Sequence, residues 1–101
     1  MTKIRLIIVS LASLVLIACS DYQQARSAYE GGNYGKAFAL FKKMSEAGDV
    51  RAEYDLSLMY LQGIGTPQDL TQAWYWMRQA ANHGNQLAMV ELGGRHEYGV
   101  D

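Results

Sequence analysis

The stretch that decides the fold is Ala52–Gly84, which reads AEYDLSLMYLQGIGTPQDLTQAWYWMRQAANHG. Its apolar residues recur every three or four positions on both sides of a loop that contains Gly63, Gly65 and Pro67. This spacing predicts two amphipathic helices, because residues three and four apart share one helix face. Gly84 closes the stretch at the place where a left-handed glycine ends a helix. The stretch is therefore predicted to be a helix, a loop and a second helix.

The chain on either side repeats parts of this stretch. Sliding the sequence by 36 residues superposes Gly48 on Gly84 and Leu56 on Leu92. A fixed period of this length is typical of stacked helical repeats. We therefore predict an all-α fold, a short right-handed solenoid of antiparallel helix pairs. It has about two and a half repeats, in units 21–48, 49–84 and 85–101.

Each predicted helix begins at a residue whose short polar side chain can accept a hydrogen bond from the first free backbone N–H groups. The predicted helices cover about 21–30, 34–47, 50–62, 70–83 and 86–97. Their predicted caps are Asp21, Asn33, Asp49, Asp69 and Asn85.

Composition excludes several classes of function. With 101 residues the chain allows one small domain and leaves little room for a large enclosed active site. Residues 19–101 carry seven basic and ten acidic side chains without a basic stripe, so nucleic-acid binding is not expected. Cys19 is the only cysteine, which excludes an intrachain disulfide and a cysteine-based metal cage.

The first residues are predicted to be a targeting segment. Lys3 and Arg5 precede an apolar run from Leu6 to Ala18, which matches the apolar region of a secretory signal. The residues that end this run, Leu-Ile-Ala-Cys19, resemble the bacterial lipoprotein signal. That resemblance implies a leader over 1–18, lipid (palmitate) attachment at Cys19, and a lipid anchor in the outer membrane facing the periplasm. The alternative is an ordinary cleaved signal or membrane anchor with an incidental cysteine.

The central motif identifies a family resemblance. Ala52-xxx-Leu56-xxx-Tyr60-xx-Gly63-x-Gly65, followed by Asp69-xxx-Ala73-xx-Trp76-xxx-Ala80-Ala81-xx-Gly84, resembles one complete Sel1-like repeat, a tetratricopeptide-like unit. Residues 25–48 resemble a shortened preceding unit, and 88–99 resemble the first half of a following one. Ser57 stands where glycine is usual, and its small size is expected to preserve the helix crossing. The resemblance implies a module that binds a protein or peptide in an inner groove.

The candidate partner-binding residues lie on the side of the 50–62 helix opposite Ala52. By resemblance this side corresponds to the inner groove of the repeat, and Tyr75 is a further candidate on the outer face. The tryptophans Trp74 and Trp76 are predicted to pack in the core or between repeats. The candidates on the inner side are Arg51, Tyr54, Leu58 and Leu61.

Catalytic, metal and cofactor sites are not expected. His83 and His96 have no carboxylate or cysteine at ligand spacing, and His83 suits the negative end of its helix. Glu46, Glu53 and Asp55 are interpreted as solvated charges, and no serine lies near a base. The Gly63–Gly65 pair lacks the lysine and serine or threonine of a phosphate loop.

Three functions remain open from the sequence. The first is a membrane-anchored adaptor or scaffold that binds a protein or peptide partner in the cell envelope. The second is an envelope enzyme or enzyme inhibitor that acts on cell-wall material or β-lactams, which convergent titratable groups would favour. The third is a structural lipoprotein that self-associates through an uncapped last helix, where Leu87 and Val90 are expected to lack an intrachain partner.

Overall fold

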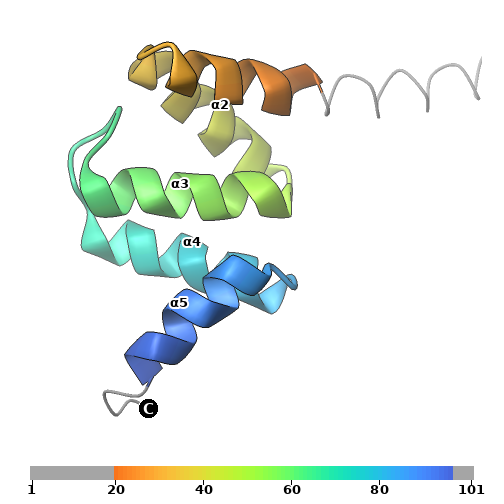
Figure 1. Ribbon diagram of the computed structural model, residues 1–101, viewed down its shortest axis with the longest axis vertical. Coiled ribbons are helices and arrows are strands. Elements are labelled where there is room, and N and C mark those ends of the chain that lie inside the picture. Colours follow the sequence, from red (N-terminus) through yellow and green to blue (C-terminus); the bar gives the residue numbers. More distant parts are fainter. Residues whose placement is uncertain (1–19, 97–101) are drawn as a thin grey trace, which may run out of the picture.

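The computed structural model describes residues 20–96, and all regular structure in that range is helical. A helix over residues 20–30 is followed by α2 (Tyr34–Glu46), α3 (Val50–Gln62), α4 (Leu70–Asn82) and α5 (Gln86–His96) (Figure 1). The predicted all-α helical-repeat fold is confirmed. The leader 1–18, Cys19 and residues 97–101 lie outside the described range. Within 20–96, no helix combines the length and apolar character needed to cross a membrane.

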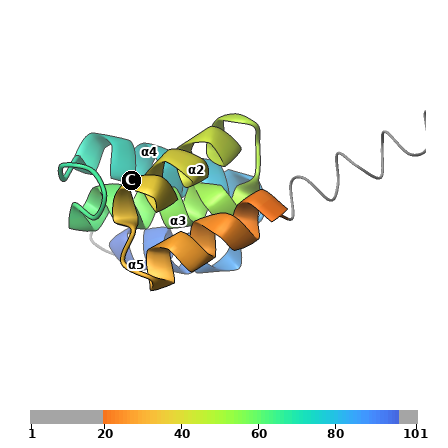
Figure 2. The same cartoon turned by 90° about the horizontal axis from the view of Figure 1, so that it is seen from above.

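The helices form two layers. The 20–30 helix, α3 and α5 lie in one layer, and α2 and α4 lie in the other (Figures 1 and 2). Consecutive helices pack against each other: α3 contacts both α2 and α4, and α4 contacts α5. This alternation is the arrangement of a helical solenoid, in which each unit packs on its neighbours.

The helix starts follow the predicted capping chemistry at four of five positions. Asn33, Asp49, Asp69 and Asn85 each accept a hydrogen bond from a backbone N–H two or three residues further on. The predicted cap at Asp21 is wrong, because residue 20 is already helical and Asp21 lies inside the helix. Its carboxylate instead lies 4.0 Å from the Nζ of Lys43 on α2.

The loop between α3 and α4 depends on a close backbone approach at Gly65. Gly65 has a φ of +75°, in the left-handed region that favours glycine. A Cβ added there would overlap the carbonyl oxygen of Tyr34 and lie 2.9 Å from its carbonyl carbon. The absence of a side chain at Gly65 therefore allows this loop to rest on the start of α2.

The core contains two clusters of buried side chains. The tryptophans are half-buried and pack at their edges, Trp76 on the first cluster and Trp74 on the second. Ser57 is fully buried beside α4, and its hydroxyl donates to the carbonyl of Tyr54 at 2.6 Å, so the helix crossing tolerates the exchange of glycine for serine as expected. The first cluster comprises Ala25, Ala37, Phe41, Met44, Ala52, Leu56, Met59, Tyr60 and Ala73, and the second comprises Met77, Ala80 and Ala88.

Candidate functional site

The candidate site is the surface that the 20–30 helix and α3 form together, which we call the inner face. On the first helix, positions 22, 26 and 29 are spaced so that their side chains share one side. On α3 the buried apolar residues face the core. The side of α3 turned away from them carries a strip of exposed and half-buried side chains. The buried apolar residues are Ala52, Leu56, Met59 and Tyr60. The inner face is lined by Tyr22, Arg26, Tyr29, Arg51, Tyr54, Asp55, Leu58 and Gln62.

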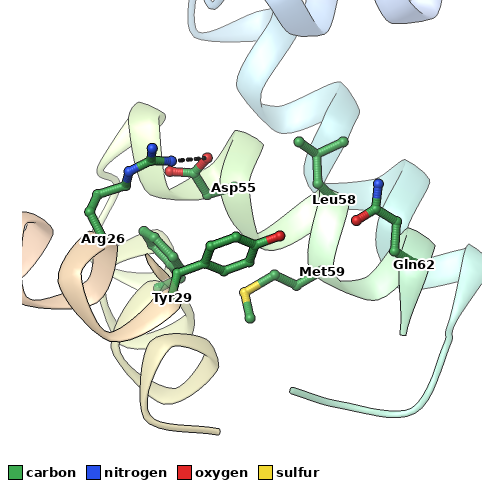
Figure 3. A pocket seen from close by; sticks show the side chains of 7 residues that line it. Arg26, Tyr29, Asp55, Leu58, Met59 and Gln62 are labelled. Atoms are coloured by element: carbon green, nitrogen blue, oxygen red, sulfur yellow. Dashed lines mark ion pairs between the residues drawn. The ribbon is translucent and has the colours of Figure 1, made fainter. Parts of the chain in front are cut away.

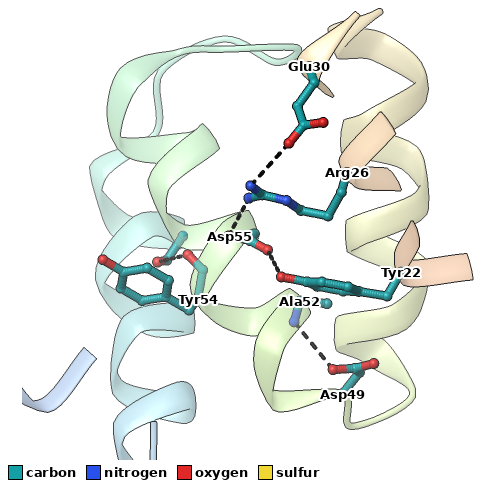
Figure 4. Close-up of polar contacts among 8 residues, drawn as sticks. Tyr22, Arg26, Glu30, Asp49, Ala52, Tyr54 and Asp55 are labelled. Atoms are coloured by element: carbon teal, nitrogen blue, oxygen red, sulfur yellow. Dashed lines mark hydrogen bonds and ion pairs between the residues drawn. The ribbon is translucent and has the colours of Figure 1, made fainter. Parts of the chain in front are cut away.

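A polar network joins the two helices at one end of the inner face (Figure 4). The hydroxyl of Tyr22 donates to Oδ2 of Asp55 at 2.8 Å. The guanidinium of Arg26 lies 3.9 Å from Oδ1 of Asp55 and 3.5 Å from the carboxylate of Glu30. The network therefore fixes the first helix against α3 through residues 33 positions apart in the chain.

Arg51 lies at the edge of the same network. Its guanidinium carbon lies 4.2 Å from the centroid of the Tyr22 ring, within the range of a cation–π contact. It also contacts the carboxylate of Asp49 at 2.9 Å. Burial alone would raise the pKa of Asp49, but the hydrogen bond and charge of the Arg51 side chain, together with the backbone N–H groups of Ala52 and Arg51, outweigh it and lower the pKa.

Burial controls the titration of the central pair. Burial and then the hydrogen bond to Asp55 raise the pKa of Tyr22 to about 12. Burial also raises the pKa of Asp55, although the Tyr22 hydroxyl and Arg26 oppose that effect. The Asp55 carboxylate is thus held in a poorly solvated position, with its side chain only 16% exposed.

Beside this network lies a cavity of about 160 Å³ between the 20–30 helix and α3. Figure 3 shows Tyr29 reaching from the first helix toward Met59, with Leu58 and Gln62 across from it on α3 and the Arg26–Asp55 pair at the other end. Phe41 and Met59 are 1% and 2% exposed, so the floor of the cavity is part of the first core cluster. The lining residues are Arg26, Tyr29, Phe41, Asp55, Leu58, Met59 and Gln62.

The structure places four of the five candidate residues on α3. Arg51 is exposed, and Tyr54, Leu58 and Leu61 are half-buried. Tyr54 and Leu58 also pack against the second core cluster, and Leu61 packs against the first. Burial and then the charge of Glu91 on α5 raise the pKa of Tyr54.

Tyr75 lies apart from the other candidates. It is 45% exposed on α4, in the other helical layer, and its ring makes an edge contact with Trp76 at 5.0 Å between centroids. A partner on the inner face and a contact at Tyr75 would therefore engage different surfaces. The partner-binding role of all five residues stays a prediction.

Sequence reasoning missed several residues of the inner face. Tyr22, Arg26 and Tyr29 share one side of a helix, and that spacing is readable in the sequence. Glu53 and Asp55 were interpreted as solvated charges, which is wrong: Glu53 is 2% exposed and the Asp55 side chain 16%. What Asp55 faces depends on a helix far away in the chain, so no local pattern indicates it.

Glu53, the other carboxylate that is buried and not solvated as predicted, lies away from the cavity. Its Oε1 lies 2.8 Å from Nδ1 of His83, the residue at the C-terminal cap of α4. This contact explains how a buried carboxylate is accommodated between α3 and α4. Among the described residues, no group of three or more histidine, cysteine, aspartate or glutamate side chains is placed to hold a metal ion.

Comparisons with known proteins connect this geometry to a family. Residues 24–49 and 50–85 each match the Sel1 repeat. The crystal structure of a Sel1 repeat protein from Oxalobacter formigenes is similar with a TM-score of 0.72 and 31% identity, over 76% of this chain and 24% of that one.

A second relative is described as a chitin synthase regulator, SKT5, from Malassezia restricta. It is 37% identical over 57 residues, which is 56% of this chain and only 4% of that protein. This chain therefore spans a small part of the length of each relative. Sel1 repeats generally mediate protein–protein interactions and are typically non-enzymatic modules. With two consecutive matches over most of its described helices, the chain belongs to the Sel1 repeat family.

Proposed function

We propose that this protein is a membrane-tethered interaction module of the cell envelope, which binds a protein or peptide partner on its inner face. The observation that carries the proposal is the cavity on the inner face, which opens beside a network of charged side chains. Interfaces combine apolar pockets with aromatic and arginine anchors, and the inner face offers both. The interaction role of Sel1 repeats supports the same reading.

The tether is the second part of the proposal. The apolar leader and the Leu-Ile-Ala-Cys19 motif support lipid attachment at Cys19, with Ser20 favouring the outer membrane under the sorting rule of lipoproteins. Several acyl chains on one residue suffice for stable anchoring. We expect metabolic labelling with a palmitate analogue to mark the native protein and to be lost in Cys19→Ala. Labelling that persists in Cys19→Ala would contradict the anchor.

Crosslinking and capture from intact cells tests the adaptor role. The native protein is compared with Cys19→Ala, with Tyr54→Ala/Leu58→Ala, and with Tyr75→Ala on the other layer. We expect one envelope partner, whose recovery falls with the first two changes; Tyr75→Ala tests separately whether the candidate on the other layer contributes. Because Tyr54 and Leu58 also pack on the core, circular dichroism must show that the double variant remains folded. Capture that is unchanged in the folded double variant contradicts binding on the inner face.

Self-association is a second candidate function, and it rests on one observation. Leu87 and Val90 lie three positions apart on one side of α5 and are 61% and 72% exposed, which is unusual for two large apolar side chains that share a helix face. A second copy of the chain would cover them. Sedimentation of the purified full chain tests this: the assembly should weaken in Val90→Lys, and a monomer at all concentrations would refute it.

A further inference from the structure

We infer that the cavity between the 20–30 helix and α3 is an anchor pocket for one bulky apolar side chain, such as phenylalanine, from a protein segment that carries lysine or arginine beside it. This inference rests on the proposed function and specifies the partner. It concerns the seven lining residues described above.

The size of the cavity favours a single side chain over a small-molecule ligand. Sites for drug-sized molecules and cofactors enclose roughly 300–1,000 Å³. This cavity holds about 160 Å³. A cavity of about 150 Å³ lined by apolar groups is large enough for benzene. The volume therefore fits one aromatic ring or one large aliphatic group.

The lining divides into an apolar floor and a polar rim. Phe41 and Met59 close the bottom, and the ring of Tyr29 and the side chain of Leu58 form the walls. Methionine sulfur and aromatic edges both make favourable contacts with an aromatic ring. Gln62 and Arg26 lie at the rim, where their N–H groups can donate to the backbone carbonyls of a docked segment.

The charged side chains around the pocket determine which residue of the partner is favoured beside the apolar side chain. Arg26 is shared between Glu30 and Asp55, and Arg51 is paired with Asp49, so both cations near the pocket already have anionic partners. The Glu30 side chain remains 67% exposed at this edge. The carboxylates thus exceed the arginines, which favours a basic neighbour on the partner and disfavours an acidic one.

Methionine methyl groups provide a direct test on the full chain in lipid nanodiscs. The protein is labelled with ¹³C at its methionine methyls, and acetyl-phenylalanyl-lysine amide is titrated to millimolar concentration. We expect a saturable shift of the Met59 methyl, because a ring in the cavity lies against it. Met77 and Met89 serve as internal references, since Met77 is buried in the second core cluster and Met89 is exposed on α5.

Two further probes separate the parts of the inference. Acetyl-alanyl-lysine amide should bind at least about tenfold more weakly, because alanine buries far less apolar surface. Acetyl-phenylalanyl-glutamate amide should bind about threefold more weakly, since solvent screens charges at an exposed rim. Equal shifts of Met59 with the alanine and phenylalanine probes, or a shift of Met89 instead, would overturn the pocket. Equal binding of the lysine and glutamate probes would overturn the basic neighbour.

A variant with a bulky side chain at the rim of the cavity, compared with the same change on α5, tests where the probe binds. Gln62 is exposed at the rim, so Gln62→Trp adds bulk over the cavity without opening the core. We expect it to weaken the phenylalanyl-lysine probe at least fivefold. The same change at an exposed position of α5, Gln86→Trp, should leave binding unchanged.

The outcome is distinguishable from that of the proposed function. If capture from cells depends on Tyr54 and Leu58 but Met59 does not respond to the phenylalanyl probe, the interaction role stands and the pocket is wrong. If capture from cells is unchanged both in Tyr54→Ala/Leu58→Ala and in Gln62→Trp, the interaction role on the inner face is wrong, whatever the probes show.

Discussion

Replacing Gly65 by alanine should destabilise the protein far more than the same change at Gly32, a left-handed glycine with open space around it. The added Cβ would overlap the carbonyl oxygen of Tyr34 and lie 3.1 Å from the methyl carbon of Met59. The methionine end can move, but the Tyr34 carbonyl belongs to the first residue of α2. Relief of the overlap therefore requires the loop or α2 to shift.

The magnitude follows from two contributions. A non-glycine residue in the left-handed region costs about 1 kcal/mol. Forcing an extra carbon into a packed site costs typically about 1–3 kcal/mol more. We therefore expect Gly65→Ala to lower the free energy of unfolding by about 2–4 kcal/mol.

Gly32 provides the matched control for this experiment. It has a φ of +84°, and a Cβ added there would meet no atom within 4 Å. Gly32→Ala should therefore show only the conformational contribution of about 1 kcal/mol. Urea unfolding followed by circular dichroism measures both variants, with an unchanged slope as the sign of an intact two-state transition. Equal losses in the two variants would refute the steric argument.

Three further predictions concern polar contacts. Tyr22→Phe keeps both ring contacts but removes the hydrogen bond to Asp55, so it should cost about 1–2 kcal/mol near pH 7. That hydrogen bond opposes the effect of burial and lowers the pKa of Asp55, so it stabilises the protein where Asp55 is ionised, and this stabilisation is lost as pH falls through the pKa of Asp55. The loss of unfolding free energy in Tyr22→Phe should therefore be larger at pH 7 than at pH 3, as unfolding at the two pH values measures. His83→Ala should lower the free energy of unfolding by about 1–3 kcal/mol, because it leaves the buried Glu53 carboxylate without this partner. The same change should cost markedly less in a Glu53→Ala background, which a double-mutant cycle measures. Asp69→Ala removes the side-chain acceptor for the Gln72 N–H and should lower the free energy of unfolding by about 1 kcal/mol, whereas Asp69→Asn should lower it less; urea unfolding measures both variants.

The parts of the fold that depend on local chemistry were predictable from the sequence. The bounds of α3 agree with the prediction, and four caps are confirmed, because capping and amphipathic spacing involve residues only a few positions apart. The core side of α3 is predictable for the same reason, because Ala52, Leu56, Met59 and Tyr60 are spaced to share one helix face and all four are buried. Asp21 failed as a cap because the helix extends to residue 20, which the run of polar residues there does not indicate.

The candidate site was less predictable because its defining contacts join distant residues. Tyr22 meets Asp55 across 33 positions, and Glu53 meets His83 across 30. The same limit applies to Gly65, whose glycine requirement arises from Tyr34 on an earlier helix. A sequence pattern can place each residue on a side of its helix. It cannot state which side chain of a neighbouring helix will face it.

The packing of α3 restricts where binding specificity can be encoded. One side of the helix supplies Ala52, Leu56 and Met59 to the first core cluster, and Tyr54 and Leu58 pack on the second. Changes at these positions alter stability together with any interface. Gln62 is exposed and lines the cavity without belonging to either cluster or to the Arg26–Asp55 network that fixes the first helix against α3. Because solenoid units stack through their cores, a change of partner can be accommodated at this rim position with the least effect on stacking. Selectivity for a partner should therefore reside in the polar rim, while the apolar floor supplies affinity that is shared with the stability of the fold.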